Sequence, residues 1–250
     1  MKRLLSILLA VLGGAGTLLA ANVAADFSAA NQFYAEGKFS EAAKVYESLL
    51  NSGVVSPNLL FNDGNAEFKA GNVGRAIAAY RRAALLAPRD SDIRANLGFV
   101  RNQVQGDTLR DNQWSRLENW LGALTLNEWA VLAAILFWLT FLLLAAIQIR
   151  PGLKNLLRTP ARMAAVAAIC VCGCLAGGTH LHYSESIAVV VLPDAMARSG
   201  PFGDAQNAFA VHDGAELAVL DQRNGWVQVS DGNGRSGWMP DAQVEVVPAI

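Results

Sequence analysis

Residues 129–147 read WAVLAAILFWLTFLLLAAI, and residues 163–179 read MAAVAAICVCGCLAGGT. The first run holds nineteen residues without a charge, and a helix rising about 1.5 Å per residue needs roughly 20 apolar residues to cross the hydrocarbon core. The second run approaches this length when it is extended through Leu181. Because lipid offers the backbone no hydrogen-bonding partner, both runs are predicted to be helices. We expect a transmembrane hairpin with helices at 129–149 and 163–183.

The segment between the runs, residues 150–162, is basic. It contains no acidic residue and carries Arg150, Lys154, Arg158 and Arg162. Short connections rich in Lys and Arg stay in the cytoplasm. The flanking parts of the chain, on both sides of the hairpin, are therefore predicted to lie outside the cytoplasm, which places the protein in the cytoplasmic (inner) membrane.

The N-terminus indicates the same orientation. Lys2 and Arg3 precede an apolar stretch, and small residues follow at 23–25. This is the pattern of a secretory signal peptide or N-terminal anchor, here residues 1–25.

Charge is divided unevenly along the chain. The formal net charge is −1, which gives no global case for nucleic-acid binding. The part after residue 183 is acidic, with three basic and nine acidic residues, whereas residues 26–120 are balanced. Such blocks indicate separate solvent environments rather than one globule.

An internal repeat follows the signal segment. Gly37 and Gly71 are 34 residues apart, as are the alanines at 42 and 76 and the tyrosines at 46 and 80. This period and spacing resemble the tetratricopeptide repeat, a pair of helices stacked on the next pair. Residues 26–105 are thus expected to form an all-α repeat domain, with residues 90–105 as a terminal capping helix. The resemblance implies a peptide-binding concave face, whose candidate residues are Phe27, Asn31, Tyr34, Phe61, Asn65, Lys69, Phe99 and Asn102.

Residues 106–128 form a linker with an amphipathic pattern. Trp114, Leu117, Leu121 and Leu124 recur at spacings of three and four residues, which predicts one apolar helical stripe. With Trp120 and Trp129 nearby, we favour a helix lying on the membrane surface. The alternative is a helix docked on the repeats.

The second apolar run is rich in small residues. Gly173 and Gly177 form a GxxxG pattern, which favours close helix packing in a membrane. The run also holds Cys170, Cys172 and Cys174. Alternate residues on one helix do not converge on a metal ion, so we interpret the cysteines as packing residues and expect no metal or cofactor. A redox or metal site using them with His180 and His182 is the lesser alternative.

Residues 184–250 show period-two alternation with turn signals at Asn224-Gly225 and Gly232-Asn233-Gly234. The order of strands, with NGWVQVSDGNGRSGWMP near the end, resembles a bacterial SH3-like domain, a small all-β barrel. Trp226 is expected to anchor its core. Trp238 is expected to be partly exposed and is a further partner-binding candidate.

The chain carries no motif for catalysis: a Walker loop, a dinucleotide fingerprint, HExxH and a nucleophile elbow are all missing from the sequence. We therefore expect a binding protein and not an enzyme. The order of repeats, hairpin and SH3-like domain resembles the BatE proteins of bacterial aerotolerance (Bat) operons, which also encode a MoxR-type ATPase and membrane proteins with von Willebrand A domains. The resemblance implies a membrane-anchored scaffold, with those von Willebrand A-domain proteins as partners in envelope stress resistance. A cell-wall sensor whose SH3-like domain binds peptidoglycan peptide is the alternative.

Overall fold

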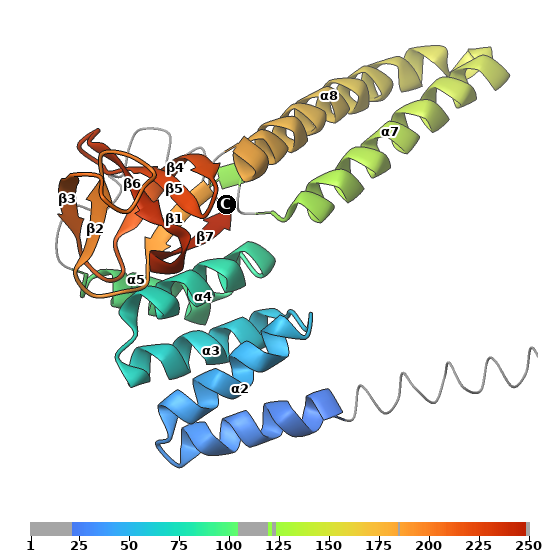
Figure 1. Cartoon of the computed structure of the whole chain (residues 1–250). Helices are drawn as coiled ribbons and strands as arrows, with labels where there is room; N and C mark the ends of the chain where they lie inside the picture. Colours follow the sequence, from blue (N-terminus) through green and yellow to red (C-terminus); the bar gives the residue numbers. More distant parts are fainter. Residues whose placement is uncertain (1–21, 105–119, 122–123, 185, 249–250) are drawn as a thin grey trace, which may run out of the picture.

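The computed structural model describes residues 22–104, 120–121, 124–184 and 186–248, and side chains at 180–184 and 248 are not described. It has a helical region, a long helical hairpin and a β-sheet domain (Figure 1). The apolar N-terminal segment and most of the predicted amphipathic linker lie outside the described residues. Helix covers residues 22–35, so the predicted cleavage region at 23–25 falls in its first turn, where Val23 packs on neighbouring side chains.

The helical region repeats its contacts with the predicted period. The helix at residues 22–35 is followed by α2 (Phe39–Asn51), α3 (Pro57–Ala70), α4 (Val73–Leu86) and α5 (Ser91–Arg101). Gly37 and Gly71 end their helices with φ of 77° and 92°, the left-handed region in which glycine avoids strain. Tyr46 and Tyr80 are both buried, each between the helices of its own pair. Equivalent positions of the helical region, 34 residues apart, thus have equivalent surroundings. That this region belongs to the tetratricopeptide family stays a prediction.

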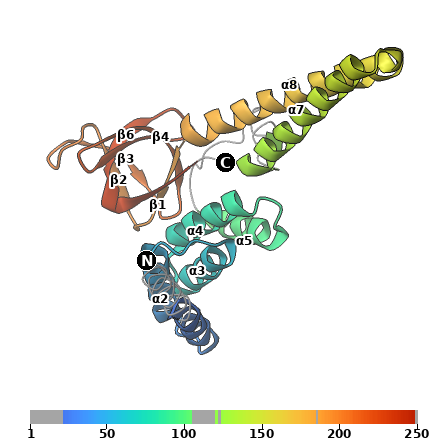
Figure 2. The ribbon, with the colours of Figure 1, turned by 90° about the vertical axis from the view of Figure 1, so that its right-hand side faces the viewer.

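The hairpin consists of two helices that lie side by side along their length and project away from the other parts (Figures 1 and 2). Helix α7 (Leu126–Ile149) begins at a capping box between Thr125 and Glu128, and α8 spans Lys154–Ser184. Within Leu126–Ile149 and Pro151–Thr179, an 18-residue window reaches a mean hydropathy of 2.7 and 1.7, respectively. By length and composition both helices could therefore cross a membrane.

The basic connection is shorter than the sequence predicts. Only Arg150 and the short helix η1 (Pro151–Leu153) separate the two long helices, and α8 runs through Pro160. Most of the segment expected as a loop at 150–162 is thus helical, because Lys, Arg, Leu and Ala all favour helix.

The C-terminal part, here called the sheet domain (residues 186–248), is a strongly curved antiparallel sheet. Its strands follow the spatial order β3-β2-β6-β5-β4-β1-β7, and alternate residues enclose a core that includes Val190, Leu217, Val229 and Met239. The turn Asn224-Gly225 joins β4 to β5 with φ of 49° and 80°, as the hairpin signal predicts. The strands are β1 (Ser186–Val190), β2 (Ala195–Arg198), β3 (Asn207–Val211), β4 (Glu216–Arg223), β5 (Trp226–Ser230), β6 (Ser236–Pro240) and, after the turn η2 (Asp241–Gln243), β7 (Val244–Pro248).

The expectation that Trp226 anchors this core is wrong. In β5 the residues facing the core are Val227 and Val229, and Trp226 is half-buried outside the core cluster. Successive side chains of a strand point to opposite faces, so the two valines and the tryptophan cannot share the interior.

The sheet domain packs directly on the repeats. Val189 and Val247, from β1 and β7, are fully buried against Ile77 and Tyr80 of α4 and Val100 of α5. This places the sheet at the end of the helical stack, next to α4 and α5 (Figure 1). The end of the helical stack is therefore covered by strands β1 and β7 as well as by the predicted capping helix α5.

Polar contacts fix the same interface. The backbone N–H of Gly74, in the first turn of α4, donates to Asp213 Oδ1 at 3.1 Å. The N-cap residue Asn72 does not cap α4 with its own side chain, which donates to Glu67 instead. A carboxylate of the sheet domain thus caps a repeat helix. Glu216 is buried and accepts from Arg101 Nε and Nη2 at 3.0 and 2.9 Å, and Arg81 Nη1 lies 3.5 Å away.

We predict that Gly74→Ala disrupts this interface. A Cβ at residue 74 would lie 1.9 Å from Val190 O, so α4 and β1 would have to separate, at a cost of about 1–3 kcal/mol or more. A lower midpoint of thermal unfolding in detergent and faster proteolysis between the domains are expected.

The control is Gly98→Ala in α5, where a Cβ would meet nothing within 4 Å. Alanine favours helix over glycine by about 0.8–1.0 kcal/mol, so this variant should be as stable as the parent or more so. Equal unfolding midpoints for the two variants would contradict the docked arrangement.

Candidate partner-binding surfaces

The first candidate surface is formed by asparagines on the first helix of each repeat pair. Tyr46 Oη donates to Asn31 Oδ1 at 2.7 Å, and Asn62 Nδ2 donates to the same oxygen at 3.1 Å. In the next pair, Tyr80 Oη donates to Asn65 Oδ1 at 2.7 Å, and Asn96 Nδ2 does so at 2.9 Å. We call this surface the amide face (Asn31, Asn62, Asn65, Asn96).

These contacts orient each amide. Burial raises the pKa of Tyr46 and of Tyr80 to about 12, so both phenols stay protonated and continue to donate. Because Oδ1 of Asn31 and of Asn65 receives two donors, each amide is held with Nδ2 as its available donor. Within the described part of the chain, no side chain or carbonyl accepts from these two Nδ2 groups.

The amide face thereby presents donors and acceptors in pairs. Asn31 keeps its Nδ2 as a donor, and Asn62, which donates to Asn31, keeps its Oδ1 as an acceptor; Asn65 and Asn96 repeat this arrangement. An extended peptide backbone carries one N–H and one C=O per residue. Two such pairs can bind a peptide main chain with little dependence on its side chains.

The other groove candidates have different surroundings. Phe27 and Phe61 are half-buried and pack on Tyr46 and Tyr80 as tilted ring pairs, with the same 5.9 Å between ring centroids, so both help to hold the tyrosines. Tyr34 is half-buried against Phe39. The remaining three are exposed, with Phe99 in edge contact with Phe68: Lys69, Phe99 and Asn102.

The second candidate surface lies on the outer face of β2, β5 and β6. Trp238 is half-buried, as expected, and is cross-strand from Gln228 and Arg198. The Arg198 guanidinium lies 5.8 Å from the Trp226 ring. We call this surface the tryptophan face (Arg198, Trp226, Gln228, Trp238). It is separate from β1 and β7, which contact the repeats, so docking leaves it open.

The small residues of α8 divide between two sides of the helix. Ala161, Ala164 and Gly178 are buried, and a Cβ at Gly178 would lie 3.3 Å from Leu126 of α7. At Gly177 the nearest atom to a Cβ would be a Leu121 carbon at 3.7 Å, and at Gly173 nothing lies within 4 Å. Gly173 is therefore outside the contact between α7 and α8, and its packing against another protein stays a prediction.

The cysteines do not converge. Cys170 and Cys172 are exposed and Cys174 is half-buried. In the described part of the chain, no three His, Cys, Asp or Glu side chains are placed to hold a metal ion. The side chains of His180 and His182 lie outside that part.

A buried carboxylate stands behind the amide face. Asp63 on α3 is only 8% exposed and its Oδ1 has no hydrogen-bond partner within the described residues. The pKa of Asp63 is raised to about 7, mainly by burial and additionally by the nearby charges of Glu67 and Glu245, against the opposing charge of Arg82. The group therefore titrates near neutral pH.

Sequence reasoning found half of the amide face. It selected Asn31 and Asn65 but missed Asn62 and Asn96, although these are also 34 residues apart and the same period would have identified them. It also missed Arg198 and assigned Trp226 to the interior.

Comparison with known proteins identifies the class of the sheet domain. Residues 193–245 match the family model of the bacterial SH3 domain, in agreement with the antiparallel sheet over this region. The C-terminal part of the chain is thus an SH3-like domain of the bacterial type. A search of curated proteins finds no match to the chain.

We predict that Asp63→Asn removes a pH dependence of stability. Between about pH 4 and pH 7 the folded protein keeps a proton on Asp63 that the unfolded chain releases, so the free energy of unfolding falls as pH rises through this window. The amide of the variant cannot ionise. The variant should be more stable than the parent above pH 7, by an amount on the order of a few kcal/mol, and little different at pH 4.

The measurement is thermal unfolding of the detergent-solubilised chain at pH 4, 6 and 8, followed by tryptophan fluorescence. Asp204→Asn, which changes an exposed carboxylate between β2 and β3, is the control and should follow the parent. A parallel pH profile for Asp63→Asn and the parent would contradict the assignment.

Proposed function

We propose that this protein is a membrane-anchored adaptor that binds partner proteins outside the cytoplasm. In this proposal the tetratricopeptide-like repeats bind an extended segment of one partner at the amide face, and the SH3-like domain offers the tryptophan face for a second contact. The role is binding and not catalysis.

One observation carries the proposal: the docked repeats and SH3-like domain form one unit beside the apolar hairpin, with both candidate faces open. Two weak sites held at a fixed separation gain affinity from effective concentration when one partner engages both. The hairpin would keep this unit at the membrane, where partners with their own membrane helices are confined to the same surface.

The proposed partners follow from the resemblance to BatE proteins. They are membrane proteins with von Willebrand A domains in a Bat/MoxR-type complex, with a role in envelope stress resistance or aerotolerance. The pattern of the amide face supports a peptide main chain as the group bound, and it does not select among sequences.

The test is crosslinking in native membranes, with a photoreactive residue in place of the exposed Lys69. We predict that the parent chain recovers a membrane partner and that Asn31→Ala combined with Asn65→Ala lowers recovery at least about tenfold, since two backbone hydrogen bonds of about 1 kcal/mol each are lost.

The matched control is Asn51→Ala, at the exposed end of α2, which should leave recovery unchanged. Thermal unfolding should be measured for all variants, because Asn31 and Asn65 also receive the tyrosine hydrogen bonds. Unchanged recovery with the double variant would reject the amide face as the binding surface. Recovery of no membrane partner by the parent would reject the adaptor.

A second candidate function is cell-wall sensing by the SH3-like domain. The stacked Arg198 and Trp226 beside Trp238 favour it, because aromatic side chains with one wet edge are frequent anchors for polar ligands. We predict that the solubilised full chain sediments with insoluble peptidoglycan and that Trp238→Ala releases it. A chain that stays in the supernatant at low salt would eliminate this function.

A further inference from the structure

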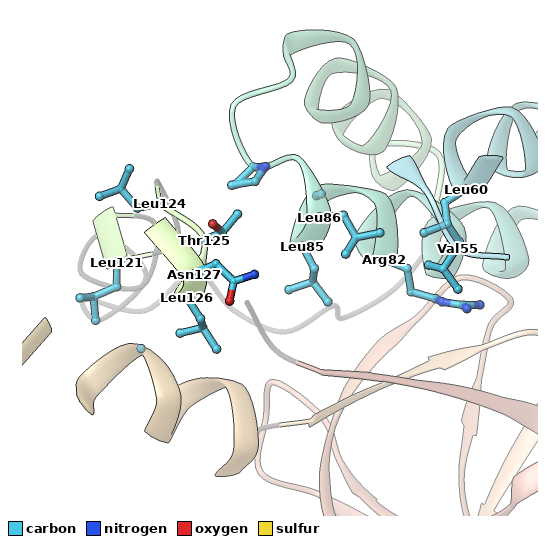
Figure 3. Close-up of a pocket in the computed structure, with 13 residues that line it drawn as sticks. Val55, Leu60, Arg82, Leu85, Leu86, Leu121, Leu124, Thr125, Leu126 and Asn127 are labelled. Carbon is cyan, nitrogen blue, oxygen red and sulfur yellow. The ribbon is translucent and has the colours of Figure 1, made fainter. Parts of the chain in front are cut away.

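A cavity of about 620 Å³ lies between the repeats and the end of the hairpin at which α7 begins. It is lined mainly by leucines, and Figure 3 shows them on two facing walls. Leu60, Leu85 and Leu86 come from α3 and α4, and Leu121, Leu124 and Leu126 come from the entry into α7. The size lies within the range of about 300–1,000 Å³ that is usual for sites of small organic molecules.

The two walls face each other without closing. Leu86 is 46% exposed although it lines the cavity, so the described part of the chain leaves apolar surface uncovered there. An ion pair between Arg89, just after α4, and Glu128, in the first turn of α7, connects the walls at one edge. The described residues thus contact each other across the cavity at this edge.

The cavity lies where the apolar helices begin and end. Thr125 and Leu126 mark the start of α7, and Gly178 lies near the end of the second apolar stretch. Trp120 and Trp129 stack there at 5.6 Å between ring centroids, and Trp129 Nε1 donates to Leu121 O. Tryptophans at the ends of membrane helices lie at the level of the lipid headgroups, so a molecule entering the cavity would come from the outer hydrocarbon surface.

The charge of the cavity fits a hydrocarbon chain. Its charged lining residue, Arg82, has Nη1 3.2 Å from Glu245 Oε1, so the cation is already compensated. Thr125 Oγ1 is occupied as the acceptor for Glu128 N. A phosphate or carboxylate would find no free cation on these walls, whereas an apolar chain loses nothing on entry.

We propose that this cavity binds one acyl chain of a membrane phospholipid, drawn out of the leaflet next to the soluble domains. The proposal rests on the membrane position of the hairpin that the adaptor function assumes. The bound lipid would fill the space between the repeats and the hairpin and hold the soluble unit close to the bilayer surface.

The experiment uses the full chain in vesicles of phosphatidylethanolamine and phosphatidylglycerol. The vesicles contain a small fraction of phosphatidylcholine with a diazirine at the end of one acyl chain. After irradiation, labelled residues are mapped by mass spectrometry of the digested protein. We expect label on residues 84–88 or 124–126 in addition to the lipid-exposed side of α7, where Trp138 and Phe141 are exposed.

Leu86→Trp fills the cavity from an exposed position and should abolish label on these two segments without changing label on α7. Leu220→Trp alters a leucine of similar exposure on β4 that does not line the cavity, and should change nothing. Label on α7 with none on the cavity segments overturns the lipid site and leaves membrane anchoring intact. Cavity label that survives Leu86→Trp also overturns the site, and absence of label on α7 removes the membrane position itself.

Discussion

Helix α4 approaches strand β1 closely enough to share a buried surface only because residue 74 has no side chain. The Gly74 position lies against the Val190 carbonyl, and its own N–H is taken by Asp213. From this contact the rest follows: Ile77 meets Val189 and Val247, and Glu216 reaches Arg81 and Arg101. The arrangement of both candidate binding faces depends on this one close approach.

The ion pairs of the interface, between Glu216 and the two arginines Arg81 and Arg101, mainly fix the orientation of the SH3-like domain on the repeats. Removing a carboxylate and a guanidinium from water costs several kcal/mol, and their attraction returns about the same amount. Glu216 with its two arginines is therefore a weak source of stability. A displaced SH3-like domain would, however, leave that carboxylate buried without partners. The apolar contacts of α4 hold the domains together, and Glu216 selects the one orientation in which its charge is compensated.

Periodicity explains which features the sequence could predict. Three local patterns are visible in the sequence: nineteen uncharged residues in a row, a 34-residue repeat with glycines at its turns, and an Asn-Gly hairpin signal. The apolar helix, the helical repeat and the β4–β5 turn of the structure lie at these patterns. The docking has no such pattern. Gly74 and Asp213 are 139 residues apart, and Arg81 and Glu216 are 135 apart. Single residues at such distances carry no pattern, and an interior glycine in α4 reads only as a weak helix former.

The tyrosine and asparagine pairs could be predicted from the sequence only in part. The repeat period located Tyr46, Tyr80, Asn31 and Asn65, but it could not show that the phenols orient the amides. That relation depends on the crossing of two helices and on side-chain geometry. The error at Trp226 has a similar origin, because alternation defines two faces of a strand and does not by itself say which one is interior.

The docked interface also bears on membrane topology. If α7 and α8 are embedded in a bilayer, strands β1 and β7 can contact α4 only when the chain crosses an even number of times between them. A single anchoring helix would leave the SH3-like domain on the far side, with Val189, Val247 and Glu216 deprived of their partners. The second helix is then more than an added anchor: it returns the C-terminal strands to the face of α4 that they cover. In that case the interface requires both soluble parts to share one side of the membrane. The side proposed for them, away from the cytoplasm, rests on the charges of Arg150, Lys154, Arg158 and Arg162.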